Sequence, residues 1–297
     1  MTFTTTIKDE ITKIETSKVE SLTELLIYLK INGTWNNNQF QLFIENASVA
    51  RRIFKLLKKN YSINIQLTIR RQKKFRKKVI YILSINEKIE DIYIDIGSFN
   101  KLTLESCEEK YALLKGVFVA CGSINDPKSG IYHAEFLIKN YKDTVLVNKI
   151  LQSFGFNSKY IKREKGYMIY LKSAEEISDL IKILGGMNAL FYFEDIRIYR
   201  DHKNMVNRLN NMEQANTDKI ISTAQDQIKK INHLKEKGLF DLLEVKTKLV
   251  LEYRLKYPDS SYQELADIIS LETDTKISKS GINHHFRNLN ELFQKHE

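Results

Sequence analysis

The stretch LLKGVFVACGSINDP (residues 113–127) repeats the pattern of an earlier stretch, LLIYLKINGTW (residues 25–35). Each is an apolar run of helical character that ends at a glycine, and the two glycines, Gly33 and Gly122, lie 89 residues apart. Runs rich in β-branched and aromatic residues, such as INIQLTI and YMIYL, predict strands at equivalent places after both glycines. The first part of the chain is therefore an internal duplication.

Both copies follow the same order of elements. In the first copy we expect helices at residues 19–31 and 47–59, and strands at 39–44, 63–70 and 79–85. In the second copy we expect helices at 107–120, 142–154 and 174–184, and strands at 132–139, 158–162 and 167–171. A repeat of this size, led by a helix in each half, indicates a pseudo-two-fold pair of α/β units. We expect the strands to form a saddle with two basic hairpins at its rim.

Composition narrows the class of protein. The 297 residues are 42% hydrophobic, which is enough for two or three globular domains. No apolar run is long enough to cross a bilayer, and the N-terminus lacks the pattern of a secretory signal, so we expect a cytoplasmic protein without membrane contact. Cys107 and Cys121 are too few for a zinc site by themselves, and we expect both to be packing residues.

The positive charge is local. Residues 51–80 contain twelve Lys or Arg and no Asp or Glu, and since the whole chain carries +10, the remainder sums to −2. The cations lie in RRIFKLLKK (residues 51–59) and in RRQKKFRKK (residues 70–78), the second of which falls between two predicted strands. A solvated hairpin tip is the alternative, but self-repulsion among uncompensated cations favours a nucleic-acid partner. The predicted phosphate-binding residues are Arg70, Arg71, Lys73, Lys74, Arg76, Lys77 and Lys78.

The C-terminal stretch SSYQELADIISLETDTKISKSGINHHFRNLNELF (residues 260–293) predicts a helix-turn-helix over residues 261–293. Ser261 and Glu264 have the spacing of a capping box, and Ser278 is placed to cap the second helix. Residues at helical spacing then face a core: Ile282, Phe286, Leu289 and Phe293. Seven residues, 271–277, separate the two helices, which implies a stretched or winged variant.

The outer face of the second helix carries side chains that bind phosphates or base edges. These predicted DNA-binding residues are Ser278, Lys279, Ser280, Asn283, His284 and Arg287. The alternative is that two short amphipathic helices merely present a solvated polar face. We expect this all-α domain to span residues 238–297, with a further helix at 242–257 packed behind the two helices of the helix-turn-helix.

A polar helical linker is expected over residues 196–237. Its stretch NMVNRLNNMEQANTDK (residues 204–219) includes Asn207 and Arg208. By composition alone, these side chains form the exposed face of a connecting helix.

The duplicated stretches resemble degenerate signature helices of LAGLIDADG homing endonucleases. The whole chain resembles the WhiA family of sporulation and cell-division regulators, most specifically in KGVFVACGSINDP (residues 115–127), residues 204–219 and SKSGINHHFRNL (residues 278–289). The resemblance implies an α+β fold, in which a duplicated LAGLIDADG-like αββαββα body over residues 1–195, with halves of about 1–100 and 101–195, precedes the all-α domain. It also implies a bacterial, nucleoid-associated transcriptional regulator of cell division and chromosome segregation. The implied partners are double-stranded DNA and other transcription or cell-division proteins. Because the resemblance runs through residues 204–219, it also implies that Asn207 and Arg208 either help to join the two modules or add a contact to the DNA backbone, and both alternatives stay open.

The nuclease chemistry of such a body requires an acidic residue at the foot of each signature helix, because carboxylates must hold Mg²⁺ beside the scissile phosphate. The resemblance places those positions on Asn32 and Cys121, with Lys30 and Val119 at the neighbouring acidic positions. Amide and thiol bind a hard cation poorly, so we expect no catalytic residue, metal or cofactor. A residual nuclease based on Asp126, which we read as a turn residue, and a protein-docking adaptor are the alternatives.

Overall fold

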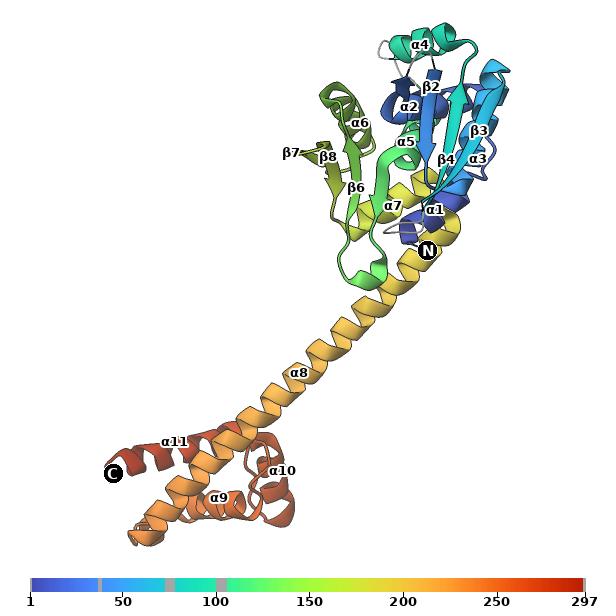
Figure 1. The fold of residues 1–297 in the computed structure, drawn as a ribbon. Helices are drawn as coiled ribbons and strands as arrows, with labels where there is room; N and C mark the ends of the chain where they lie inside the picture. Colours follow the sequence, from blue (N-terminus) through green and yellow to red (C-terminus); the bar gives the residue numbers. More distant parts are fainter. Residues whose placement is uncertain (1, 37–38, 73–77, 100–105, 296–297) are drawn as a thin grey trace. The chain divides into compact units, whose positions relative to one another are not determined.

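The computed structural model describes residues 2–36, 39–72, 78–99 and 106–295 (Figure 1). The chain divides into two compact units, the first ending at Arg200 and the second starting at Asp201. Helix α8 (Met187–Glu236) supplies residues to both units.

The first unit consists of two αββαββα halves after a short N-terminal helix, α1 (Phe3–Ile11). The first half comprises α2 (Lys18–Asn32), β1 (Thr34–Asn36), β2 (Gln39–Ile44), α3 (Ala47–Tyr61), β3 (Ile65–Gln72), β4 (Lys78–Ile85) and α4 (Ile89–Ser98). The second half comprises α5 (Cys107–Cys121), β5 (Gly122–Ile124), β6 (Ala134–Ile138), α6 (Tyr141–Ser153), β7 (Lys159–Arg163), β8 (Gly166–Leu171) and α7 (Ala174–Leu184). The antiparallel sheets have the equivalent orders β1-β2-β4-β3 and β5-β6-β8-β7, which confirms the predicted duplication.

Capping residues and glycines set the ends of the two leading helices, α2 and α5. A capping box begins each helix, Ser17 with Glu20 and Ser106 with Glu109. Gly33 and Gly122 follow the helices at ordinary negative φ, so backbone freedom does not explain them. A Cβ at Gly33 would lie 2.2 Å from Cζ of Phe40, and one at Gly122 would lie 2.3 Å from Cδ2 of Phe118. The glycines are therefore required by close packing.

Helices α2 and α5 pack against each other, and α5 lies between the two sheets (Figure 1). At Gly116 of α5, an added Cβ would lie 2.4 Å from Cγ2 of Ile27 and 2.6 Å from the carbonyl oxygen of Glu24. Only glycine permits this approach, because any larger residue would push the two helices apart. Gly116 therefore sets the distance between the two halves.

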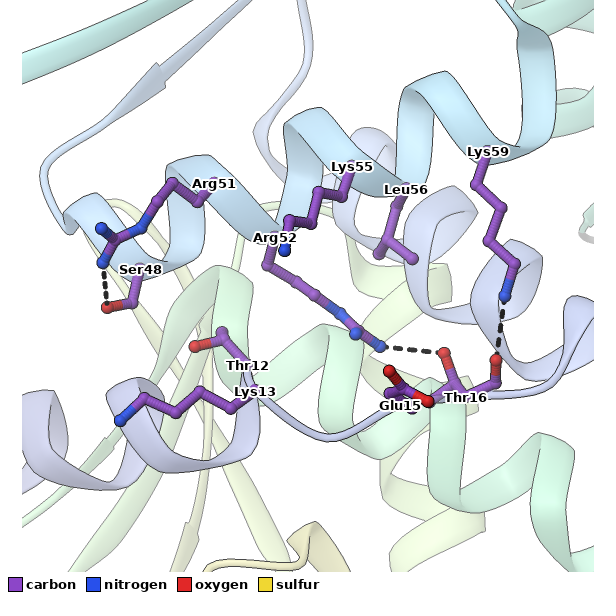
Figure 2. Close-up of a pocket in the computed structure, with 10 residues that line it drawn as sticks. All are labelled: Thr12, Lys13, Glu15, Thr16, Ser48, Arg51, Arg52, Lys55, Leu56 and Lys59. Atoms are coloured by element: carbon purple, nitrogen blue, oxygen red, sulfur yellow. Dashed lines mark hydrogen bonds between the residues drawn. The ribbon is translucent and has the colours of Figure 1, made fainter.

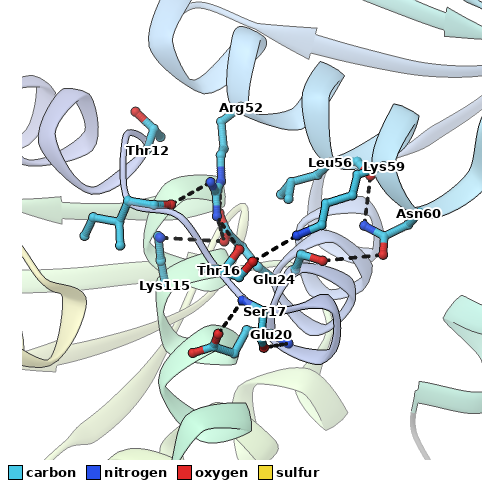
Figure 3. A network of polar contacts seen from close by, with 12 residues as sticks. Thr12, Thr16, Ser17, Glu20, Glu24, Arg52, Leu56, Lys59, Asn60 and Lys115 are labelled. Carbon is cyan, nitrogen blue, oxygen red and sulfur yellow. Dashed lines mark hydrogen bonds and ion pairs between the residues drawn. The ribbon is translucent and has the colours of Figure 1, made fainter.

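A buried charge network joins the halves at the same place (Figure 3). Glu24 of α2 is fully buried, and its carboxylate accepts two hydrogen bonds from Arg52 of α3, at 2.7 and 3.1 Å. Nζ of Lys115, from α5 of the other half, lies 3.7 Å from the same carboxylate. Burial lowers the pKa of Lys115. Glu24 is the shared counter-charge of two cations that the fold removes from water.

The second unit packs the end of α8 against three further helices. These are α9 (Val245–Lys256), α10 (Tyr262–Glu272) and α11 (Lys279–Lys295), preceded by a 3-10 turn, η3 (Phe240–Leu242). The core includes Ile231, Leu234, Val250, Leu251, Leu265, Ala266 and Ile269, together with the predicted Ile282, Phe286 and Leu289. Phe293 is half-buried and packs edge-on against the ring of His233.

The predicted helices of this unit are present, with one difference in bounds. The predicted helix at 242–257 starts three residues later, at Val245, because Phe240 is buried in a separate 3-10 turn. The structure describes no strand in residues 201–295, so of the two predicted variants the stretched one is observed, with residues 273–278 as the connection between α10 and α11. Hydrogen bonds in both directions between Ser270 Oγ and the backbone of Ile277 hold this connection closed.

None of the helices within the described residues combines the length and the apolar character needed to cross a bilayer.

Replacing Glu24 by Ala should destabilise the first unit by about 3–5 kcal/mol, because Arg52 and Lys115 would stay buried without their counter-charge. Urea unfolding followed by the fluorescence of Trp35, the single tryptophan, reports on this unit. The control is Glu15→Ala, which removes an exposed carboxylate and should change the unfolding free energy by less than about 0.5 kcal/mol. Equal effects of the two substitutions would contradict the assigned role.

Candidate nucleic-acid interface

The first turns of α11 are held by local hydrogen bonds. Ser278 Oγ accepts the N–H of Gly281 at 3.3 Å, and the Ser278 carbonyl accepts the N–H of Ile282 at 2.9 Å. Ser278 therefore caps α11 as predicted. The cap and the buried row formed by Ile282, Phe286 and Leu289 orient the helix so that its remaining face points to solvent.

The predicted DNA-binding residues of α11 gather on that solvent face. Ser278, Lys279, Ser280, His284 and Arg287 are exposed, and Asn283 is half-buried. His285 points elsewhere: its Nδ1 lies 3.0 Å from Thr247 Oγ1 of α9, and burial lowers its pKa. The outer face of α11 thus combines two cations with hydroxyl, amide and imidazole groups. These groups can bind phosphate oxygens, adenine and guanine edges.

The basic hairpin of the first unit is only partly described. Arg70 and Arg71 lie exposed at the end of β3, and Lys78 begins β4 opposite Gln72. Lys73, Lys74, Arg76 and Lys77 lie outside the described residues. These positions stay predictions.

Strand register shows which of the two arginines lies on the open face of the sheet, meaning the face away from its covering helices. Leu83 and Ile85 of β4 are buried, so Ile80 and Ile82 face the other side. Arg70 pairs with Ile80 and shares its face, whereas Arg71 pairs with Val79 on the helix side. The same argument places Lys159 and Arg163 of β7 on the open face of the second sheet, because β8 buries Ile169 and Leu171.

The other basic run, residues 51–59, belongs to α3, on the covered side of the first sheet. Arg51, Arg52, Lys55 and Lys59 line a cavity of about 600 Å³ with Lys13 and Glu15 (Figure 2). The expectation that all twelve cations of residues 51–80 lack a counter-charge is wrong for Arg52, which pairs with Glu24. The error arises because Glu24 precedes that stretch of sequence. Lys59 Nζ also donates to the Thr16 carbonyl at 2.9 Å.

The structure brings the feet of the two signature helices together. Asn32 Nδ2 donates to the Ala120 carbonyl at 3.1 Å, across the helix pair. Cys121 Sγ donates to the Val117 carbonyl of its own helix at 3.4 Å, and burial raises the pKa of Cys121 to about 12. An amide and a protonated thiol therefore occupy the two positions.

A lysine that the sequence pattern did not single out approaches this foot. Lys8 of α1 lines the same cavity as Asn32, and its Nζ lies 5.6 Å from the centroid of the Phe118 ring. Burial lowers the pKa of Lys8 to about 8, so the ammonium form still predominates at pH 7. Thr4 anchors α1 here, because its hydroxyl donates to the Ile124 carbonyl and accepts the Ile124 N–H, both at 2.9 Å.

Glu45 lines the same cavity as Asn32 and Lys8, whereas Asp126 and Asp143 are engaged elsewhere. Asp126 caps a 3-10 turn, η2 (Pro127–Ser129), by accepting the Lys128 N–H at 2.9 Å, which confirms it as a turn residue. Lys30 pairs with Asp143 of α6. In the described part of the chain, His, Cys, Asp and Glu side chains nowhere gather in groups of three that could hold a metal ion.

Asn207 and Arg208 are exposed on α8, in the second unit. Two later residues of the same polar stretch, Asn216 and Lys219, line a cavity together with Lys279 of α11 and Arg254 of α9. The sequence pattern gave Arg254 no role. In the sequence, Arg254 stands out only as the single arginine of the predicted amphipathic helix at 242–257.

Three family models match successive parts of the chain. The WhiA N-terminal LAGLIDADG-like domain matches residues 19–97, the WhiA LAGLIDADG-like domain matches 110–203, and the WhiA C-terminal HTH domain matches 206–293. Among solved structures, full-length DUF199/WhiA from Thermatoga maritima has a TM-score of 0.61 at 22% identity, covering 99% of both chains. The N-terminal LAGLIDADG domain of DUF199/WhiA has a TM-score of 0.52 at 22% identity, covering 62% of this chain and 92% of that one.

Whole-length relatives give the same result. The probable cell division protein WhiA of Bacillus cytotoxicus is 37% identical over 311 aligned positions, covering 99% of this chain and 97% of the relative. The protein of the same name from Macrococcus caseolyticus is 36% identical over 310 positions, covering 99% of this chain and 96% of the relative. The two LAGLIDADG-like halves, the helix-turn-helix and these matches lead to one assignment: the chain belongs to the WhiA family.

Proposed function

We propose that the chain is a sequence-specific DNA-binding transcriptional regulator that acts in cell division and chromosome segregation, and that it does not cleave DNA. The observation that carries the proposal is the outer face of α11, where exposed Lys279, Ser280, His284 and Arg287 stand over a buried row of apolar residues. The cell-division role rests on the names of the relatives. In this proposal α11 reads bases, while the basic hairpin of the first unit adds phosphate contacts.

The absence of cleavage is argued from the feet of the signature helices. Mg²⁺ requires anionic oxygen ligands, whereas Asn32 supplies an amide and Cys121 a thiol whose pKa is raised. The ammonium of Lys8 in the same cavity as Asn32 opposes a divalent cation by direct repulsion. The scaffold can therefore hold a duplex without positioning the metal that cutting requires.

Replacing Arg287 by Ala should weaken binding to a specific operator by about 1–3 kcal/mol and relax the preference at one base pair. Crosslinking the protein to genomic DNA would supply the operator, and fluorescence anisotropy would measure affinity for it and for single-base variants. The matched control is Lys295→Ala, which removes an exposed cation from the last turn of the same helix. Uniform weakening across all base variants would show that Arg287 contacts the backbone only.

Replacing Arg70 and Arg71 together by Gln should reduce the salt dependence of DNA binding, by about 0.9 in the log–log slope for each phosphate that is no longer neutralised. The control pair is Arg51→Gln with Lys55→Gln, which removes the same charge from α3 on the covered side of the sheet. If the salt slope falls equally in the two double variants, the effect is one of net charge in general. If the slope of the Arg70 and Arg71 variant is unchanged, the hairpin does not contact the DNA backbone.

Purified protein should leave supercoiled plasmid intact in the presence of Mg²⁺ or Mn²⁺, because Asn32 and Cys121 supply no carboxylate at the two signature-helix feet. Agarose electrophoresis after prolonged incubation is the measurement. Nicking that disappears in Asp126→Asn but persists in Asp179→Asn, an exposed carboxylate on α7, would instead favour a residual nuclease.

A further inference from the structure

A cavity of about 530 Å³ lies within the second unit, where α10 and α11 begin. Its walls include Asn216 and Lys219 of α8, Arg254 of α9, Ser261 and Tyr262 at the start of α10, and Lys279 at the start of α11. All ten of its lining residues are described, and none is a carboxylate. Three are cations.

Arg254 is the unusual member of this wall. It is only 1% exposed, and its guanidinium lies 5.4 Å from the centroid of the Phe286 ring and 5.8 Å from that of Tyr262. Nη1 donates to the Ser260 carbonyl at 2.6 Å, whereas Nε has no hydrogen-bond partner. Among the residues that the structure describes, no Asp or Glu forms an ion pair with Arg254. Burial lowers its pKa.

A buried cation without a counter-charge is costly, and an anion in the adjoining cavity would relieve that cost. Backbone groups favour an anion at the same place. The amides of Tyr262 and Gln263 belong to the first turn of α10, where no intrahelical acceptor exists, and α11 also begins at the cavity with Lys279. Glu264 is held in the capping box, where it accepts the Ser261 N–H at 2.7 Å, and it does not line the cavity.

We propose that this cavity is a phosphate-binding site, in which Arg254, Lys219 and Lys279 hold one phosphoryl group. Its volume falls in the range of small-molecule sites, roughly 300–1,000 Å³, so it has room for the attached sugar as well. The phosphoryl group comes from the DNA backbone or from a free nucleotide, and the first source rests on the proposed DNA-binding function. The backbone source fits the position of Lys279, which belongs both to the cavity and to the exposed face of α11.

Lys219→Gln in the full chain tests the site, because Lys219 is exposed and its loss should not affect folding. The matched control is Lys229→Gln, an exposed lysine on the same helix that does not line the cavity. The first measurement is the affinity for a random-sequence duplex over a range of KCl concentrations. The second is calorimetric titration of the DNA-free protein with inorganic phosphate and with adenosine monophosphate.

If the backbone supplies the phosphoryl group, Lys219→Gln should reduce the log–log salt slope by about 0.9, and Lys229→Gln should leave it unchanged. If a free nucleotide supplies it, the slope stays constant, while adenosine monophosphate binds the wild-type chain and Lys229→Gln but binds Lys219→Gln at least tenfold more weakly. An unchanged slope without such binding overturns the proposal. If the wild-type chain binds no duplex, the proposed DNA-binding function fails. In that case the calorimetric titration alone tests whether the cavity binds a phosphoryl group.

Discussion

The contact between α2 and α5 is the constraint on which the first unit depends. Gly116 lets α5 approach the backbone of α2 so closely that no side chain fits between them. The carboxylate of Glu24 sits at this contact and neutralises Arg52 from its own half and Lys115 from the other. Steric fit and charge therefore specify the same pairing of helices, and the sheets that follow these two helices have equivalent strand orders. A buried ion network adds little net stability, but it penalises every arrangement that leaves one member unpaired.

The same helix pair explains how the LAGLIDADG-like fold can persist without an acidic residue at Asn32 or Cys121. What keeps the fold are the glycines, the capping boxes and the apolar faces of α2 and α5, none of which needs an acidic residue at the helix feet. At those feet Asn32 now bridges to the neighbouring helix through its amide, which makes it a packing residue. The contacts that hold the fold therefore involve other atoms of the same helices than the side chains at their feet.

Much of this architecture was predictable from residue patterns, and the failures have physical causes. The strand Gln39–Ile44 and the helix Ala174–Leu184 were predicted to the residue, because alternation and helical periodicity are strong there. Strands β1 and β5 have three residues each, too few for a pattern, and they exist because β2 and β6 pair with them. Helix α1, which supplies Lys8, was not predicted. Its position at the signature-helix feet depends on contacts between residues distant in sequence, such as Thr4 with Ile124.

The exposed side chains of α11 were predictable from the helical periodicity of its sequence. The role of Arg254 was not predictable, because its burial and its unpaired Nε are visible only in the folded structure.

The environments of the two cysteines have a practical consequence for solution work. Thiol reagents react with the thiolate, so a thiol whose pKa is raised to about 12 is protected at neutral pH, as Cys121 is. Cys107 lies exposed at the first position of α5, so the expectation that it is a packing residue is wrong. Maleimide dyes or spin labels should therefore attach at Cys107 alone, without any engineering, and place a spectroscopic probe at the start of the helix that joins the two halves.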